Sequence, residues 1–184
     1  MGLKLITPPT SEPVTTEQAK LWLRLDSDAE IDTVAMLIAA ARQTLDGADG
    51  YLGRCLDTQT WALTLDRFPC EREIRIPLPP LQEVVSVKYL DSTGAEQTFS
   101  SDSYRLDSDD WSGRILLDGG ASWPSTLFER AAVTITFKAG YANGVPEGLR
   151  AEILRLVGIW FDDRSMVGQL PSDWSSRYRL VAVA

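Results

Sequence analysis

The stretch SDAEIDTVAMLIAAARQTLDGADGYLG, residues 27–53, carries the clearest structural pattern in the sequence. Its apolar residues recur at steps of three and four, which places them on one side of an α-helix. Ser27 and Glu30 have the spacing of a capping box, and Gly53 is a typical helix stop. The stretch therefore predicts one long helix over about 28–52. Its buried stripe would consist of Ile31, Val34, Ile38, Ala41, Leu45, Ala48 and Leu52.

Two large apolar residues of this helix, Met36 and Leu37, fall off the predicted stripe. A large apolar side chain outside the core needs another surface to cover it. That surface could belong to a neighbouring helix of the same chain or to another subunit. Met36 and Leu37 are therefore the candidate subunit interface.

The segment that precedes the long helix divides into an extended arm and a short helix. Pro8, Pro9 and Pro13 exclude a helix from the arm, which we expect to lie extended on the surface. Thr15 and Gln18 then form a second capping-box pair, which predicts a short helix to about residue 23.

Residues 58–140 replace helical spacing with an alternation of period two, which is typical of half-buried strands. Trp61 and Leu63 share one face of a predicted strand, and Val85 and Val87 share one face of another. No helix-length pattern separates the six or seven predicted strands. We therefore expect an antiparallel β-meander.

One predicted turn within this region has a clear sequence signature. Asp91, Ser92, Thr93 and Gly94 match a type I turn, with an acceptor side chain first and glycine last.

Pro146 is well placed to begin a third helix, which would end near Arg164. The predicted fold class is therefore α+β. It is a helical bundle of two N-terminal helices and one C-terminal helix, with an antiparallel β-meander inserted between them. We expect a single domain over 1–164, built from 1–57 (arm and helices), 58–140 (β region) and 141–164 (C-terminal helix), and followed by a docking tail over 165–184.

The tail has too few apolar side chains to fold alone, yet Trp174 and Tyr178 are unfavourable to leave in water. In an extended tail, arginines and apolar residues would alternate between two sides. We expect the tail to order against another protein or a neighbouring subunit. The alternative, a tail folded back on its own domain, stays open. The candidate partner interface is Trp174, Arg177, Tyr178, Arg179, Leu180 and Val181.

The composition argues against catalysis and against nucleic-acid binding. The 184 residues include no histidine, which is the commonest general base near neutral pH and the commonest metal ligand. The net charge is −8 and no basic run is present, whereas binding phosphate backbones requires clustered lysine and arginine. We expect no catalytic residue, no metal and no cofactor. Cys55 and Cys70 lack metal-type spacing and are expected to be reduced thiols, with a disulfide as the alternative.

Two other classes of function remain open. Trp61, Trp111 and Trp123 lie in or near predicted strands, where they could form the stacking platform of a carbohydrate-binding β module. Core packing and subunit contacts are the alternative use of these tryptophans.

Acidic clusters raise the second possibility. A carboxylate-dependent hydrolase would need two acids in one cleft. We favour surface turns and a solvated helix end as the explanation of these clusters. They comprise Asp107, Asp109, Asp110, Asp162 and Asp163.

A succession of short segments, none specific alone, gives the chain a resemblance over nearly its whole length. The segments are 3–9, 12–15, 23–26, 58–61, 63–69, 76–81, 87–91, 104–107, 123–124 and 137–141, followed by a helix start near Pro146. In this order they resemble the head–tail connector (adaptor) family of long-tailed bacteriophages, prophages and gene transfer agents.

The resemblance implies a structural subunit rather than an enzyme. The subunit would form a homo-oligomeric ring beneath the portal protein, twelve-fold to match the portal, and join the portal to a head-closure (stopper) or tail protein. DNA would pass through the ring without specific binding, and no membrane would be involved.

The implied location is the neck of a virion or phage-like particle assembled in the cytoplasm of a bacterial host. The tail over 165–184 would then order against the portal or a neighbouring subunit. A head-closure or tail-terminator subunit of the same system is the alternative role.

Overall fold

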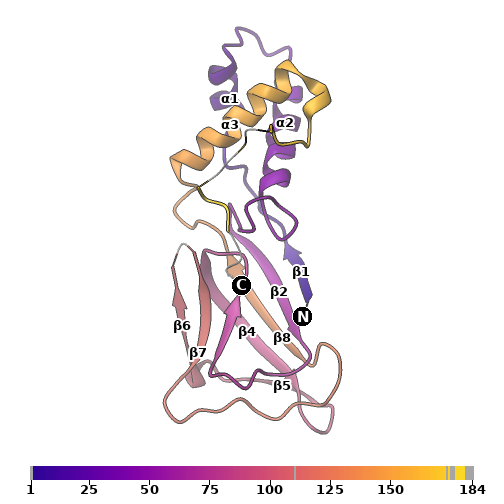
Figure 1. The fold of residues 1–184 in the computed structure, drawn as a ribbon, viewed down its shortest axis with the longest axis vertical. Helices are drawn as coiled ribbons and strands as arrows, with labels where there is room; N and C mark the ends of the chain where they lie inside the picture. The colour runs from indigo at the N-terminus through magenta and orange to yellow at the C-terminus, as the bar shows by residue number, and fades with distance from the viewer. Residues whose placement is uncertain (1, 110, 173, 175–176, 181–184) are drawn as a thin grey trace. The chain divides into compact units, whose positions relative to one another are not determined.

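The computed structural model describes residues 2–109, 111–172, 174 and 177–180, and the chain forms two compact units. The β unit comprises Met1–Pro9 and Thr58–Ala142, and the helical unit comprises Thr10–Asp57 and Asn143–Ala184. The chain therefore crosses between the units three times, as Figure 1 lets the reader trace. The predicted α+β class is confirmed, with two N-terminal helices, antiparallel strands and one C-terminal helix in that order.

The β unit contains two antiparallel sheets. A five-stranded sheet has the order β1-β2-β8-β4-β5, and a three-stranded sheet has the order β3-β7-β6. Strand β8 is flanked by β2 and β4, which lie far from it in the sequence. The strands are β1 Gly2–Thr7, β2 Gln59–Leu65, β3 Glu73–Ile76, β4 Leu81–Leu90, β5 Glu96–Thr98, β6 Tyr104–Ser108, β7 Gly113–Leu117 and β8 Val133–Ala139, with a short 3-10 helix η1 at Ser101–Ser103.

Alternation places the core of the β unit where period two predicts it. Along β8, Val133, Ile135 and Phe137 are fully buried, and their intervening neighbours are partly exposed. A close approach between the two sheets depends on Gly113 of β7. A side-chain carbon at that glycine would lie 2.6 Å from the Cβ of Leu81 in β4. Glycine is therefore required there for the sheets to pack.

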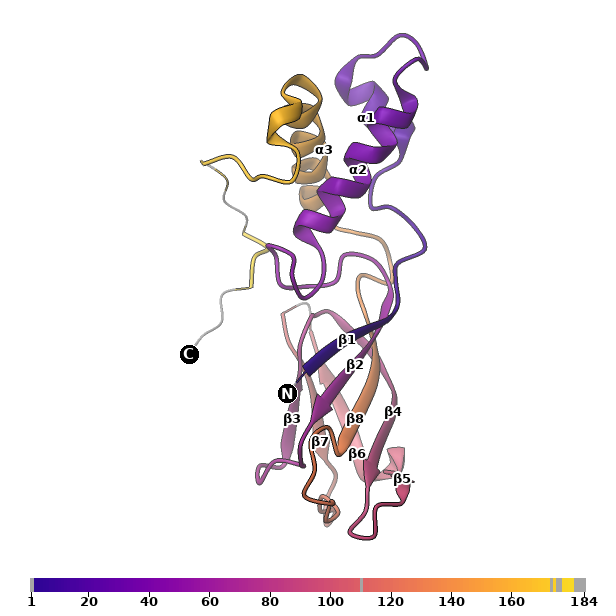
Figure 2. The ribbon, with the colours of Figure 1, turned by 90° about the vertical axis from the view of Figure 1, so that its right-hand side faces the viewer.

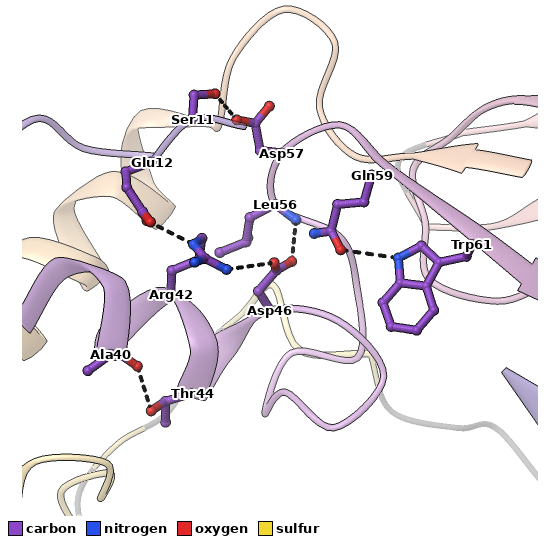
Figure 3. Close-up of polar contacts among 10 residues, drawn as sticks. All are labelled: Ser11, Glu12, Ala40, Arg42, Thr44, Asp46, Leu56, Asp57, Gln59 and Trp61. Atoms are coloured by element: carbon purple, nitrogen blue, oxygen red, sulfur yellow. Dashed lines mark hydrogen bonds and ion pairs between the residues drawn. The ribbon is translucent and has the colours of Figure 1, made fainter. Parts of the chain in front are cut away.

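Aromatic rings fill one part of this core. Phe68 stacks on Trp123 with ring centroids 5.0 Å apart, and Phe99 contacts both Phe68 and Trp123. The Trp123 indole N–H donates to the carbonyl of Glu71 at 2.8 Å, which satisfies the one polar atom of this indole. A second internal contact, from the Trp61 indole to the Gln59 side chain at 3.1 Å, is drawn in Figure 3.

Of two further features of the β unit, the sequence predicted one and missed the other. The strand β1, which pairs with β2 at the edge of the larger sheet, was not predicted. The turn at Asp91 was predicted and is confirmed, because the Gly94 N–H donates to the Asp91 carbonyl at 2.9 Å.

The helical unit contains α1 (Thr16–Leu23), α2 (Ile31–Leu45) and α3 (Glu147–Asp162), followed by a short 3-10 helix η2 at Arg164–Met166. The three helices contact one another, and Figures 1 and 2 show them side by side. The capping box at the start of α1 is confirmed. The Thr15 side chain accepts from the Gln18 N–H, and the Gln18 side chain accepts from the Thr15 N–H.

The second predicted capping box, at Ser27 and Glu30, is wrong. Helix α2 begins at Ile31, and Glu30 occupies the cap position without capping through its side chain. A backbone bond from the Ile31 N–H to the Asp28 carbonyl at 3.1 Å forms the turn that precedes the helix. The Glu30 carboxylate instead lies 3.4 Å from the Arg164 guanidinium.

The predicted end of this helix is also wrong, because α2 ends at Leu45 rather than near residue 52. Asp46 leaves the helix in an extended conformation and Gly47 adopts a positive φ of 80°. The following loop then returns to the helix end. The N–H groups of Tyr51 and Leu52 donate to the carbonyls of Thr44 and Leu45. Terminal helix carbonyls are thereby satisfied by the loop rather than by another helical turn.

Side chains fix this loop to the helical unit, as Figure 3 shows. The Asp46 carboxylate accepts from the Leu56 N–H at 2.8 Å and lies 3.8 Å from the Arg42 guanidinium. Arg42 also binds Glu12 of the arm at 2.8 Å. Arg42 therefore contacts both Glu12 of the arm and Asp46 at the start of the loop.

Across the described residues, none of the helices is both long and apolar enough to span a membrane.

Candidate assembly surfaces

The described part of the C-terminal tail lies on its own helical unit. The Trp174 side chain is only 8% exposed, and the Arg155 guanidinium of α3 stands 5.3 Å from its ring centroid. Trp174 was predicted to anchor the tail to a partner. In the structure the ring is instead buried against its own helical unit, as in the alternative of a tail folded back on its own domain.

The residues that follow also contact the helical unit. The Leu180 N–H donates to the Leu52 carbonyl at 3.0 Å, and the Arg179 guanidinium lies 4.4 Å from the Tyr51 ring centroid. Arg177 lies against the Tyr178 ring at 5.0 Å. Arg177 and Arg179 are exposed while Tyr178 and Leu180 are partly buried, so the two kinds of residue alternate. Val181, the last residue of the predicted interface, lies outside the described residues.

The tyrosine of this tail approaches the first turn of α3 closely. A side-chain carbon at Gly148 would lie 2.6 Å from the Tyr178 hydroxyl. Glycine at position 148 therefore makes room for the tail on α3.

The two candidate subunit-interface residues have opposite environments. Leu37 is 1% exposed and belongs to the core between the helices. Helices of the same chain cover Leu37, which was one of the two possibilities left open for this residue. Met36 is 60% exposed and remains available to a partner.

A second exposed apolar surface, on α1, was not predicted. Leu21 is 79% exposed and Trp22 is 52% exposed, whereas the fully buried residue of this helix is Ala19. The signal in the sequence was present but weak. Leu21, Trp22 and Leu23 are consecutive, and three consecutive residues cannot all face one side of a helix.

The β unit also exposes an aromatic side chain. Phe128, in the long loop between β7 and β8, is 94% exposed and borders a surface hollow. The Ala131 N–H of this loop donates to the Asp66 carboxylate at 2.9 Å and lowers the pKa of that carboxyl. Besides Phe128 and Asp66, the hollow is lined by Arg67, Glu129 and Arg130.

Two of the acidic residues that could have served a hydrolase, Asp109 and Asp163, act in local turns. Asp109 accepts from the Trp111 and Ser112 N–H groups, which lowers the pKa of its carboxyl. Asp163 accepts from the Ser165 hydroxyl and N–H, with the same effect on its pKa. A general acid near neutral pH requires a raised pKa. These shifts do not favour the hydrolase alternative. Asp110 lies outside the described residues.

The tryptophans do not form a sugar-stacking platform. Trp61 is buried and Trp123 is packed in the aromatic cluster, while Trp111 is exposed. A stacking platform needs neighbouring exposed rings, so this arrangement removes the basis for the carbohydrate-binding alternative.

Within the described ranges, no cluster of three or more histidine, cysteine, aspartate or glutamate residues could hold a metal ion. Cys55 is buried and Cys70 is exposed, and neither forms a disulfide.

Comparison with known proteins gives a clear structural likeness and no match by sequence. No family model matches the chain. No curated protein matches it either. A chain from the neck of an empty gene transfer agent (GTA) particle, computed with C6 symmetry, superposes with a TM-score of 0.74 at 21% identity.

Two further structures give the same result. A chain from the virion of a native GTA particle gives a TM-score of 0.74 at 21% identity. A chain from the neck of a native GTA particle, computed with C12 symmetry, gives 0.66 at 20% identity. Each superposition covers 100% of this chain and 98% of the other. The protein therefore has, from end to end, the fold of chains found in the neck and virion of GTA particles.

Proposed function

We propose that the protein is a structural subunit of the neck of a phage-like particle. Within the neck it serves as a head–tail connector (adaptor) that forms a ring beneath the portal. The observation that carries the proposal is the structural likeness to GTA neck chains over the full length of both partners. The C6 and C12 symmetries of those necks support a ring of repeated subunits. A ring of twelve subunits would match the twelve-fold portal to which we propose that it binds.

The electrostatics of the chain suit a conduit for DNA. A net charge of −8 opposes tight binding of phosphate backbones. DNA would therefore pass through the ring without being retained.

The C-terminal residues 177–180 are the proposed contact with the portal. Tyr178 and Leu180 lie toward the helical unit, while Arg177 and Arg179 are exposed. The exposed arginines would bind an acidic surface of the portal, and Trp174 would hold the tail in place from inside its own subunit. The opposite end of the ring would receive the head-closure or tail protein.

Electron microscopy of the protein mixed with the portal of its own particle tests the role. We expect a ring of additional density on the portal. The double variant Arg177→Glu and Arg179→Glu should keep its fold and lose portal binding.

Arg75→Glu is the matched control, because Arg75 is an exposed arginine of the β unit, and it should bind normally. Binding to the tail tube but not to the portal would overturn the connector role in favour of a tail terminator. Binding only to a completed portal–adaptor complex would identify a head-closure subunit.

A further inference from the structure

Helix α1 directs its largest apolar side chains away from its own subunit. Leu21 projects into solvent. One edge of the Trp22 ring lies near Gly158 of α3, and the rest of the ring is exposed. A side-chain carbon at Gly158 would lie 3.6 Å from the Trp22 indole nitrogen. The tryptophan is therefore positioned by α3 but not covered by it. Leu21 and Trp22 together form what we call the α1 knob.

Helix α2 presents a different kind of apolar surface. Its outward side carries Met36 among the small residues Ala35, Ala39 and Ala40, of which Ala35 and Met36 are exposed and the other two partly so. A helix that is apolar on nearly all sides is normally buried on all sides. We call these four residues the α2 face. It is shallow, because three of its four side chains are methyl groups.

Each surface has a charged residue beside it, and the two charges are opposite. Arg24 ends α1, and its N–H donates to the Leu21 carbonyl at 3.2 Å. Asp32 precedes Met36 by one turn on α2. Neither Arg24 nor Asp32 forms an ion pair with any described residue of the chain. The α1 knob is thus flanked by a positive charge and the α2 face by a negative one.

We propose that the α1 knob of one copy of this chain packs on the α2 face of the next copy, with Arg24 opposite Asp32. This inference rests on the proposed ring, and it names the contact that would build the ring. A cyclic ring requires two different, complementary patches on every subunit. A projecting leucine and tryptophan complement a shallow face of alanines, and the opposite charges add directionality.

Mixed single-cysteine variants test this contact. In a Cys70→Ser background, which removes the exposed native thiol, one preparation carries Leu21→Cys and the other Met36→Cys. Both positions are exposed, so both variants should fold. The two preparations are mixed at high concentration and oxidised, and the products are separated on a non-reducing gel. The control pair combines Leu21→Cys with Ala151→Cys, an exposed position on α3.

We expect a cross-linked heterodimer from the Leu21 and Met36 variants, and at least tenfold less from the control pair. Light scattering of the parent protein is measured under the same conditions. If the parent is oligomeric but the two pairs cross-link equally or not at all, the proposed contact is wrong and the ring survives. If the parent stays monomeric at every concentration and no selective cross-link forms, both the contact and self-assembly into a ring are overturned.

Discussion

Ile38 and Met36 lie two residues apart on α2 in opposite environments, since Ile38 is buried and Met36 is exposed. Ile38→Asp would place a carboxylate in an apolar interior, so we expect it to lower the free energy of unfolding by at least about 2 kcal/mol. Met36→Asp should change it by less than about 0.5 kcal/mol. Urea denaturation of both variants measures the difference. Similar destabilisation by the two substitutions would contradict this assignment of the buried side.

The Asp91 carboxyl makes a prediction about pH. Hydrogen bonds from the Thr93 and Gln97 side chains, with the Thr93 N–H, lower the pKa of Asp91 from 3.8 to about 2. A lowered pKa means that the charged form stabilises the folded turn. This contribution is complete above pH 3.8 and is lost as the pH falls through about 2. A carboxyl-carbon NMR titration should place the midpoint near 2, and Thr93→Val should raise it. A midpoint that Thr93→Val leaves unchanged would show that the hydroxyl is not the main cause.

The start of each N-terminal helix gives a matched pair of variants at the scale of an element. Thr15 caps α1 through its side chain, so Thr15→Ala should destabilise the protein by about 1 kcal/mol. Ser27 has the same sequence spacing to Glu30 but does not cap α2. Ser27→Ala should therefore have little effect. Thermal melts of the two variants provide the measurement. A larger effect at Ser27 would indicate that Ser27 does cap α2, contrary to the structure.

The α2 segment shows how far periodicity predicts an element. Leu52 was expected in the core and is fully buried there, although it lies in a loop rather than in the helix. Ala48, on the same predicted stripe, is exposed. Periodicity indicates which side chains are buried in an apolar interior. It does not report that Asp46 binds the Leu56 N–H and Gly47 adopts a positive φ, and these features end the helix.

The predicted faces of the strands were likewise wrong where the strand pairing is irregular. Val85 and Val87 were assigned to one face of a strand, yet Val87 is buried and Val85 is exposed. An irregularity in the pairing of β4 with β8 between Val84 and Ser86 separates them. A bulge of this kind depends on the partner strand. The strand's own alternation could not foresee it.

At the scale of the whole molecule, the tail is predicted to stabilise the free subunit. Trp174→Ala removes a buried ring and should lower the free energy of unfolding by about 3 kcal/mol. Deleting residues 166–184 should lower the melting temperature further, because the Trp160 indole N–H donates to the Gln169 carbonyl. Trp111→Ala, at an exposed tryptophan, is the control. Unchanged melting of the deletion variant before any partner is added would mean that the tail is not part of the folded unit.

The fold class was predictable because helical and strand periodicities occupy separate blocks of the sequence. The pairing of β8 with both β2 and β4 was not, because each strand carries the same alternation and nothing local selects its neighbour. The candidate surfaces could also be predicted only in part. Met36 could be recognised as leaving its helical stripe. The outward side of α1 depends on where α3 lies, and one chain segment cannot reveal that.

The three crossings of the chain between the units have a consequence for synthesis on the ribosome. All strands of the β unit are available once residue 142 has emerged, so its sheets can close before α3 has left the ribosome. Helices α1 and α2 are made first but must wait for α3 to complete their core. The α1 knob and the α2 face therefore reach their final positions only in a finished chain. A product truncated before α3 would therefore lack a completed helical unit, and with it both surfaces in their final positions.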